Sequence, residues 1–217
     1  MNYAQLIAAI QGYSENTFPA TAGSFSSTDQ LNTFIEQAEQ RIFNSIQFPV
    51  IRKNVTGTTT SGNKYLATPV DFLSVFSIAV IAANGSYEFL LNKDVNFIRE
   101  AYPTPTDLGT PAYYALFDEN TFILGPTPDS NYSTELHYFY YPESIVTAGT
   151  SWLGDNFDSV LLYASLLEAA AFMKSDPDTI KNYTDRYNEA LLLAKRLGDG
   201  LDRQDAYRSG QVRIPVK

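Results

Sequence analysis

Three stretches of the chain carry apolar residues at the three- and four-residue spacing of an amphipathic helix. They cover residues 28–47, 155–174 and 176–198. The apolar positions of the first are Leu31, Phe34, Ile35, Ala38, Ile42, Phe43 and Ile46. Each stretch is long enough for several helical turns, and each needs a partner to bury its apolar side. A shorter helix is predicted over residues 3–11.

The pattern changes between residues 50 and 141, where short apolar or alternating segments are separated by turn-forming residues. Strands are predicted over residues 50–56, 76–82, 87–91, 113–117, 121–124 and 135–140. Asn84-Gly85 is typical of a two-residue hairpin turn. A short helix is predicted over residues 94–102, before Pro103.

Helices therefore flank a strand-rich insertion, which predicts an α+β fold. We expect the N- and C-terminal helices to form a helical bundle, with a small antiparallel β subdomain inserted between them. The predicted divisions are N-terminal helices over residues 1–49, a β-rich insertion over residues 50–150, a C-terminal helical hairpin over residues 151–198 and an extended tail over residues 199–217.

Charge sets the tail apart from the rest of the chain. The formal net charge of the 217 residues is -9, whereas every charged side chain from Ala206 onward is basic. An acidic surface does not bind duplex DNA by neutralising phosphates, but it would let DNA slide past. Val212, Ile214 and Val216 alternate near the end, which predicts a short strand-like tip on a flexible tail.

The composition excludes several kinds of chemistry. There are no cysteines, so disulfides, thiolate metal sites and a cysteine nucleophile are excluded. No apolar run approaches the roughly 18 residues that a membrane span needs, and the first residues lack the pattern of a secretory signal. We expect a protein that is neither secreted nor embedded in a membrane.

Candidate catalytic groups are few, and each has a structural explanation. The single histidine, His137, lies in a predicted strand where alternation leaves it partly exposed. Acidic residues such as Asp118, Glu119 and Asp129 lie beside turn-forming residues. The Gly57–Gly62 segment lacks the lysine and the following helix of a phosphate-binding loop, and is interpreted as an exposed hairpin tip. We predict no enzyme activity, no cofactor and no metal site.

One structural ion pair is a candidate within the bundle. Glu168 lies among alanines and leucines of the second long helix, and Arg41 lies on the first. Small residues around Glu168 would let a partner helix approach closely. We hypothesise that Arg41 and Glu168 pair where the two helices meet. The alternative, that each faces solvent, stays open at this point.

Four segments resemble, in the same order, those of the head-to-tail adaptor proteins of tailed bacteriophages. They are Tyr-Leu-Ala-Thr-Pro-Val-Asp-Phe-Leu at residues 65–73, Gly-Thr-Pro-Ala-Tyr-Tyr-Ala at residues 109–115, Leu-Gly-Pro-Thr-Pro-Asp at residues 124–129 with Leu-His-Tyr-Phe-Tyr-Tyr-Pro at residues 136–142, and Ser-Trp-Leu at residues 151–153 leading into the Leu-Glu-Ala-Ala-Ala-Phe helix that ends at residue 172. The resemblance spans about residues 38–197. It is the order of the segments that makes the resemblance specific.

The resemblance implies a ring of identical copies, commonly a dodecamer, beneath the portal protein in the virion neck. Such a ring connects the capsid to tail or nozzle proteins, lets DNA pass through its centre and assembles in the host cytoplasm. We hypothesise that the tail anchors the subunit to the portal. The candidate portal-binding residues are Arg203, Tyr207, Arg208, Val212, Arg213 and Ile214.

Two alternatives remain at this stage. The first is another neck or tail component, such as a stopper or a tail-tube protein. The second is a carbohydrate-binding module, which is suggested only by the aromatic share of 14%, because aromatic rings also stack on sugars.

Overall fold

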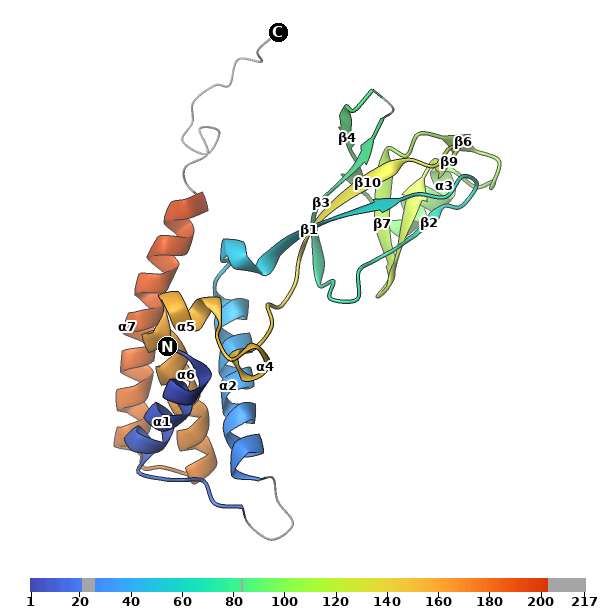
Figure 1. Ribbon diagram of the computed structural model, residues 1–217. Coiled ribbons are helices and arrows are strands. Elements are labelled where there is room, and N and C mark those ends of the chain that lie inside the picture. The colour runs from blue at the N-terminus through green and yellow to red at the C-terminus, as the bar shows by residue number, and fades with distance from the viewer. Residues whose placement is uncertain (21–25, 83, 203–217) are drawn as a thin grey trace. The chain divides into compact units, whose positions relative to one another are not determined.

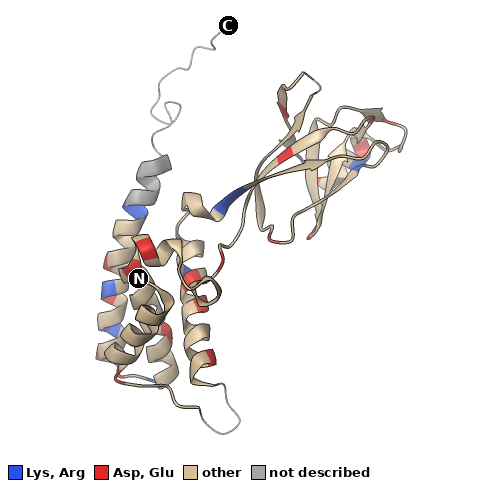
Figure 2. Cartoon of the chain, in the orientation of Figure 1, with Lys and Arg blue, Asp and Glu red and all other residues tan. Residues whose placement is uncertain are grey.

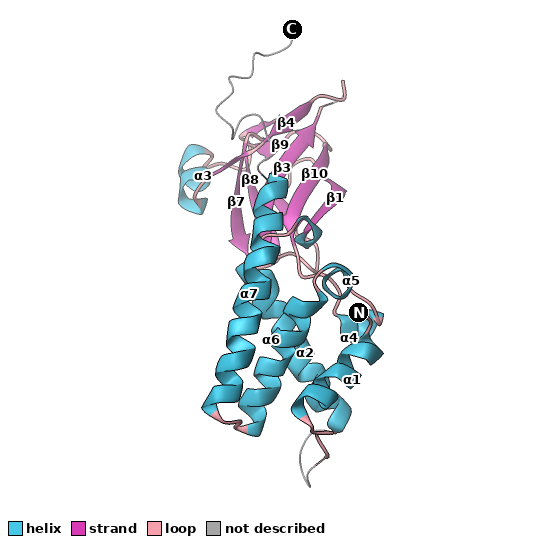
Figure 3. Cartoon of the chain, turned by 90° about the vertical axis from the view of Figure 1, so that its left-hand side faces the viewer, coloured by secondary structure: helices cyan, strands magenta, loops and turns pink. Residues whose placement is uncertain are grey.

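The computed structural model describes the backbone of residues 1–20, 26–82 and 84–202, and the side chains as far as Arg196. It divides into two compact units (Figure 1). The helical unit comprises residues 1–50 and the chain from Pro142 onward, and the β unit comprises residues 51–141. Figure 3 distinguishes helices from strands by colour, and α3 is the only labelled helix that belongs to the described residues of the β unit. The predicted α+β fold is confirmed.

Six α-helices form the described part of the helical unit. They are α1 (Tyr3–Ser14), α2 (Ser27–Ser45), α4 (Ile145–Ala148), α5 (Trp152–Asn156), α6 (Asp158–Met173) and α7 (Pro177–Asp202). Ser26 begins α2 with a capping box, because its hydroxyl accepts from the N–H of Asp29 and the Asp29 carboxylate accepts from the N–H of Ser26. A short 3-10 helix (Pro49–Ile51) follows α2 and leads into the β unit.

Helix α6 is the centre of the helical unit, since α1, α2 and α7 all pack against it. Its sequence is apolar on several sides, which suits a helix that is covered by three others. Val160, Leu161, Ala164 and Ala169 are at most 2% exposed. From α2, the residues that complete this core are Leu31, Phe34, Ile35, Ala38 and Ile42.

Helix boundaries differ from the predictions in two places. The helix predicted over residues 155–174 is divided at Phe157, whose backbone is not helical and whose ring lies 5.4 Å from Phe48 and 5.2 Å from Trp152. This aromatic cluster turns the chain between α5 and α6. The expected stop at Gly198 is also wrong, because α7 continues to Asp202, four residues into the segment interpreted as an extended tail.

The β unit contains two four-stranded sheets. Its elements are β1 (Arg52–Thr58), β2 (Tyr65–Ala67), β3 (Ser74–Ile81), β4 (Tyr87–Phe89), β5 (Leu91–Asn92), α3 (Val95–Ala101), β6 (Leu108–Gly109), β7 (Tyr113–Asp118), β8 (Thr121–Gly125), β9 (Thr127–Pro128) and β10 (Ser133–Phe139). The first sheet has the order β1-β10-β3-β4 and the second has the order β2-β8-β7-β5. The long pairs are antiparallel, and the short β5–β7 and β6–β9 pairs are parallel.

Inward-facing side chains of both sheets share one apolar core. The first sheet contributes Ile78 and Val80 of β3 and Leu136 and Tyr138 of β10. The second sheet contributes Tyr114 of β7 and Phe122 and Leu124 of β8, and Leu90 joins them from the link between β4 and β5. Successive side chains of β10 point to opposite faces of the sheet, which explains why Leu136 and Tyr138 are buried while His137 and Phe139 stay partly exposed.

The interpretation of Gly57–Gly62 as a hairpin tip is wrong. The strands on either side of this segment, β1 and β2, belong to different sheets and do not pair with each other. The segment is a connection held by the backbone of the 128–132 region, where Thr59 N–H donates to Tyr132 O at 2.9 Å and Gly62 N–H donates to Pro128 O at 2.8 Å.

Candidate interaction surfaces

The candidate portal-binding residues of the tail are Arg203, Tyr207, Arg208, Val212, Arg213 and Ile214. All six lie outside the described residues. Their binding to a portal stays a prediction.

Arg41 of α2 and Glu168 of α6 form an ion pair between an Nη2 atom and an Oε1 atom. The Glu168 side chain is 15% exposed, whereas that of Arg41 is 45% exposed. The pair therefore lies at the edge of the α2–α6 contact and reaches water through Arg41. Tyr187 of α7 is nearby, and burial raises the pKa of its hydroxyl. Side chains of three helices thus gather at this point.

Glu39, two residues before Arg41 on α2, is a buried carboxylate that sequence reasoning missed. Its side chain is 5% exposed, and its Oε1 accepts a hydrogen bond from the backbone N–H of Ile145 at 3.0 Å. Burial raises the pKa of Glu39 above its ordinary value, and hydrogen bonds from Ser144 and Ile145 partly offset this effect. Glu39 holds the start of α4 against α2, so residues 142–150 lie with the helical unit rather than with the insertion.

No local signal marks Glu39 in the sequence. It lies among polar residues of an amphipathic helix, and its partner is 106 positions away. Only the three-dimensional contact distinguishes it from a solvent-facing glutamate.

A second carboxylate, Asp71, joins two elements of the β unit. Lys53 of β1 contacts Asp71 at 2.7 Å between Nζ and Oδ2, and the hydroxyl of Tyr138 donates to Oδ1 at 2.8 Å. The Lys53 hydrogen bond is the main reason that the pKa of Asp71 lies below its usual value. Burial raises the pKa of Tyr138. The cluster fixes the segment after β2 to the first sheet.

The outer face of the first sheet carries exposed aromatic rings. Phe76 is 50% exposed and Phe89 is 67% exposed. The guanidinium of Arg52 lies 4.7 Å from the centre of the Phe76 ring and 5.7 Å from that of Phe139. The His137 ring packs edge-on against Phe76 at 4.8 Å. His137 is thus a member of an aromatic surface of the type enriched at protein interfaces.

A groove lies between β1 and β2, with a volume of about 270 Å³. Its lining residues are Val55, Thr56, Gly57, Leu66, Ala67, Thr68, Pro69, Thr134 and Leu136. Leu136 belongs to the apolar core of the β unit and Leu66 packs against that core, so the groove gives access to it. Most of these side chains are aliphatic or threonine.

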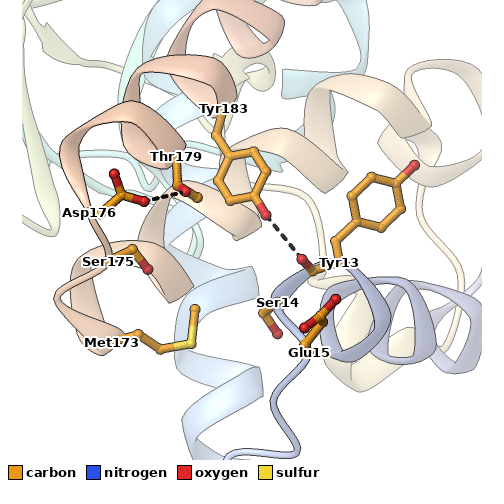
Figure 4. Close-up of a pocket in the computed structure, with 8 residues that line it drawn as sticks. All are labelled: Tyr13, Ser14, Glu15, Met173, Ser175, Asp176, Thr179 and Tyr183. Atoms are coloured by element: carbon orange, nitrogen blue, oxygen red, sulfur yellow. Dashed lines mark hydrogen bonds between the residues drawn. The ribbon is translucent and has the colours of Figure 1, made fainter.

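The helical unit has a larger open pocket of about 360 Å³ where α1 ends and α7 begins (Figure 4). The hydroxyl of Tyr183 donates to the carbonyl oxygen of Tyr13 at 3.1 Å. Thr179 donates to Asp176 at 2.7 Å, which is the main reason that the pKa of Asp176 is lowered. These polar groups complete the ends of the two helices, so the pocket is explained by helix capping.

No three His, Cys, Asp or Glu side chains among the described residues are placed to hold a metal ion. No helix within the described ranges is both long and apolar enough to cross a membrane.

The β unit thus exposes an aromatic surface, and carboxylates of the helical unit hold its helices together. The family model described as SU10 adaptor protein matches residues 1–215. The chain therefore belongs to the SU10 adaptor protein family. This membership confirms the resemblance to bacteriophage adaptors, and the protein is a phage adaptor of the structural class. No curated protein matches the chain in a sequence comparison.

Proposed function

We propose that this protein is a subunit of a ring that lies beneath the portal of a tailed phage and connects the capsid to the tail. The observation that carries the proposal is the family match over residues 1–215. In the proposed assembly the ring is a dodecamer in the virion neck, its partners are the portal protein and tail or nozzle proteins, and DNA passes through its centre.

The charge distribution supports a channel for DNA rather than a duplex-binding surface. Residues 1–50 and 142–202 carry six Lys or Arg against fourteen Asp or Glu, a formal charge of −8. The β unit carries five against nine, a formal charge of −4. In Figure 2 the positions of Lys and Arg, coloured blue on the ribbon, are scattered along the described chain. Binding to DNA through its phosphates needs clustered basic groups.

The aromatic outer face of the first sheet supports contacts between subunits. A closed ring uses two different surfaces of one chain, each complementary to the other. Phe76, Phe89 and Arg52 are of the residue types that are enriched in protein interfaces.

We propose that the tail makes the portal contact through Arg203, Tyr207, Arg208, Val212, Arg213 and Ile214. Residues 203–217 carry four basic side chains against one acidic, a formal charge of +3 in an otherwise acidic chain. An extended basic segment is suited to an acidic groove on a partner, where it orders on binding.

The test is to mix the purified protein with portal assemblies and to image the product by electron microscopy. We expect a ring of density bound to the portal, with a central channel. Reversing two tail charges (Arg208→Glu with Arg213→Glu) should weaken binding by at least about tenfold, which corresponds to about 1.4 kcal/mol.

Lys195→Glu together with Lys181→Glu changes the charge of α7 by the same amount and provides the control. Portal assemblies that carry no bound protein in the images would favour the stopper or tail-tube alternative. Equal binding by both double variants would overturn the role of the tail.

A further inference from the structure

Two strand edges without a neighbouring strand border the groove between β1 and β2. Among the described residues β1 pairs with β10 alone, and β2 pairs with β8 alone. Each strand is therefore the outermost strand of its sheet. An open edge next to an apolar groove favours pairing with a further strand.

The hydrogen-bond pattern shows which backbone groups face the groove. Tyr140 N–H donates to Ile51 O and Thr59 N–H donates to Tyr132 O, so the odd-numbered residues of β1 bond to β10. The backbone groups of Asn54 and Thr56 then point away from β10, since bonding alternates along an antiparallel strand. By the same rule the backbone groups of Ala67 point away from β8, because the Lys64 carbonyl oxygen and the Thr68 N–H form the hydrogen bonds to the β8 side. Within the described chain, no backbone partner is present for Asn54, Thr56 or Ala67.

Inward-facing side chains give the groove an apolar floor. Val55, whose side chain alternates with those of Asn54 and Thr56, is 37% exposed and lines the groove with Leu66 and Leu136. A strand that entered here would place every second side chain on this floor and the others on the outer face. The groove thus selects an extended segment with alternating apolar residues.

We propose that the groove binds the chain's own C-terminal segment, residues 211–217, as an added β-strand in the free subunit. This segment reads Gln-Val-Arg-Ile-Pro-Val-Lys, and its apolar residues Val212, Ile214 and Val216 alternate as the groove requires. Charge favours the same pairing, because residues 203–217 carry +3 and the β unit carries −4. Arg213 and Lys217 lie on the outer face, the face of the Glu135 carboxylate.

Pro215 selects the direction of the added strand. A proline has no N–H, so it occupies a position where the backbone points away from the neighbouring strand. If Val212, Ile214 and Val216 face the floor, that condition is met when the segment runs parallel to β1. In the antiparallel direction Pro215 would have to donate to β1, which it cannot do.

A short connection ties the proposed occupant to the same chain. Eight residues, 203–210, join the end of α7 to the segment and span up to roughly 26 Å when extended. A tethered segment has an effective concentration in the millimolar range when its linker spans the distance. The portal then competes with the groove for the same residues.

Amide hydrogen exchange, followed by NMR on the free protein, tests the proposal. In the full chain we expect the amides of Asn54 and Thr56 to exchange at least about tenfold more slowly than in a variant that ends at Asp202. Ile214→Asp should remove this protection, because it places a carboxylate on the apolar floor. Gln211→Asp adds the same charge at an outward position and should keep the protection.

Light scattering on the same samples identifies the source of the strand. Protection with a monomeric mass supports binding within one chain. Protection that appears only in a dimer would mean that a second copy supplies the segment and would overturn the proposal as stated. Equal exchange in the full chain and the shortened variant, or equal effects of the two aspartate variants, would also overturn it. Since no portal is used, the outcome is independent of the proposed ring.

Discussion

At the scale of single residues, two carboxylates of the helical unit, Glu39 and Glu168, have different partners and different exposure to water. Glu39 is buried and accepts from the backbone of Ile145, whereas Glu168 pairs with a half-exposed guanidinium. On folding, the Glu39 carboxylate exchanges hydrogen bonds with water for one from a backbone N–H. The Glu168 carboxylate exchanges them for an ion pair with Arg41, which still contacts water. Their substitution should therefore have different consequences.

Glu39→Gln should stabilise the protein at neutral pH. Burial raises the pKa of Glu39 in the folded state, so the protonated form stabilises the fold at low pH and this contribution is lost as the pH rises through the folded pKa. Glutamine keeps an oxygen for the Ile145 N–H and carries no charge. Thermal unfolding from pH 4 to pH 8 should show the two proteins converging at the acid end and the variant melting higher at pH 7.

Glu39→Ala is the companion variant. It strands the buried Ile145 N–H and should cost about 1–3 kcal/mol. A glutamine variant that melts below the parent at pH 7 would show that the charge of Glu39 stabilises the fold.

Glu168→Ala should lower the free energy of unfolding by about 1 kcal/mol. This loss is larger than that for most exposed ion pairs and smaller than that for breaking a fully buried one. The reason is that Arg41 is 45% exposed and regains water when its partner is removed. A double-mutant cycle with Arg41→Ala, followed by urea unfolding, measures the coupling. The pair between Arg186 and Glu189 on α7, both more than half exposed, provides the control, and its coupling should be at most about 0.5 kcal/mol. A loss of 3 kcal/mol or more for Glu168→Ala would contradict this estimate.

At the scale of elements, the sequence predicts what is local and misses what depends on distant partners. The apolar spacing of residues 28–47 predicts α2 within two residues, because an amphipathic helix carries its own signal. The break between α5 and α6 could not be predicted, because it depends on the packing of the Phe157 ring against Phe48 and Trp152.

Strand pairing and the candidate site follow the same rule. The existence of β1 and β10 is visible in the alternation of their residues, but their pairing joins positions that are about eighty residues apart. The Arg41–Glu168 contact could be hypothesised because both residues lie on helices with strong patterns. The groove cannot be anticipated, because its walls come from strands of two different sheets and from the residues that follow β2.

Packing of α3 on β8 gives a prediction at this scale. A Cβ atom at Gly125 would lie 2.9 Å from Tyr102 Cδ2 and 3.0 Å from Ile98 Cγ2, closer than packed atoms allow. Gly125→Ala should therefore push α3 from the sheet and destabilise the protein by about 1–3 kcal/mol.

Gly12→Ala is the matched control, because nothing lies within 4 Å of the added methyl group and the position is inside α1. It should leave stability unchanged or raise it by up to about 1 kcal/mol. Chemical denaturation of both variants provides the measurement. A Gly125→Ala variant as stable as the parent would show that α3 is not held as the structure shows.

At the scale of the whole molecule, both the family and the α+β fold class could be predicted from the sequence. The order of four short motifs gave the family, and the alternation of helical and strand patterns gave the fold class. Ring formation and the portal contact depend on other chains, and the proposed imaging experiment addresses them directly.

The backbone bond between Tyr140 N–H and Ile51 O, at 2.9 Å, has a consequence for the order of events during synthesis. It brings together the two ends of an insertion that separates α2 from α6, so a folded insertion shortens the loop between these helices. The loop-closure entropy that opposes the meeting of these helices is then smaller. The insertion is also complete before α6 leaves the ribosome. We therefore expect the β unit to fold first and to favour the later packing of α2 against α6.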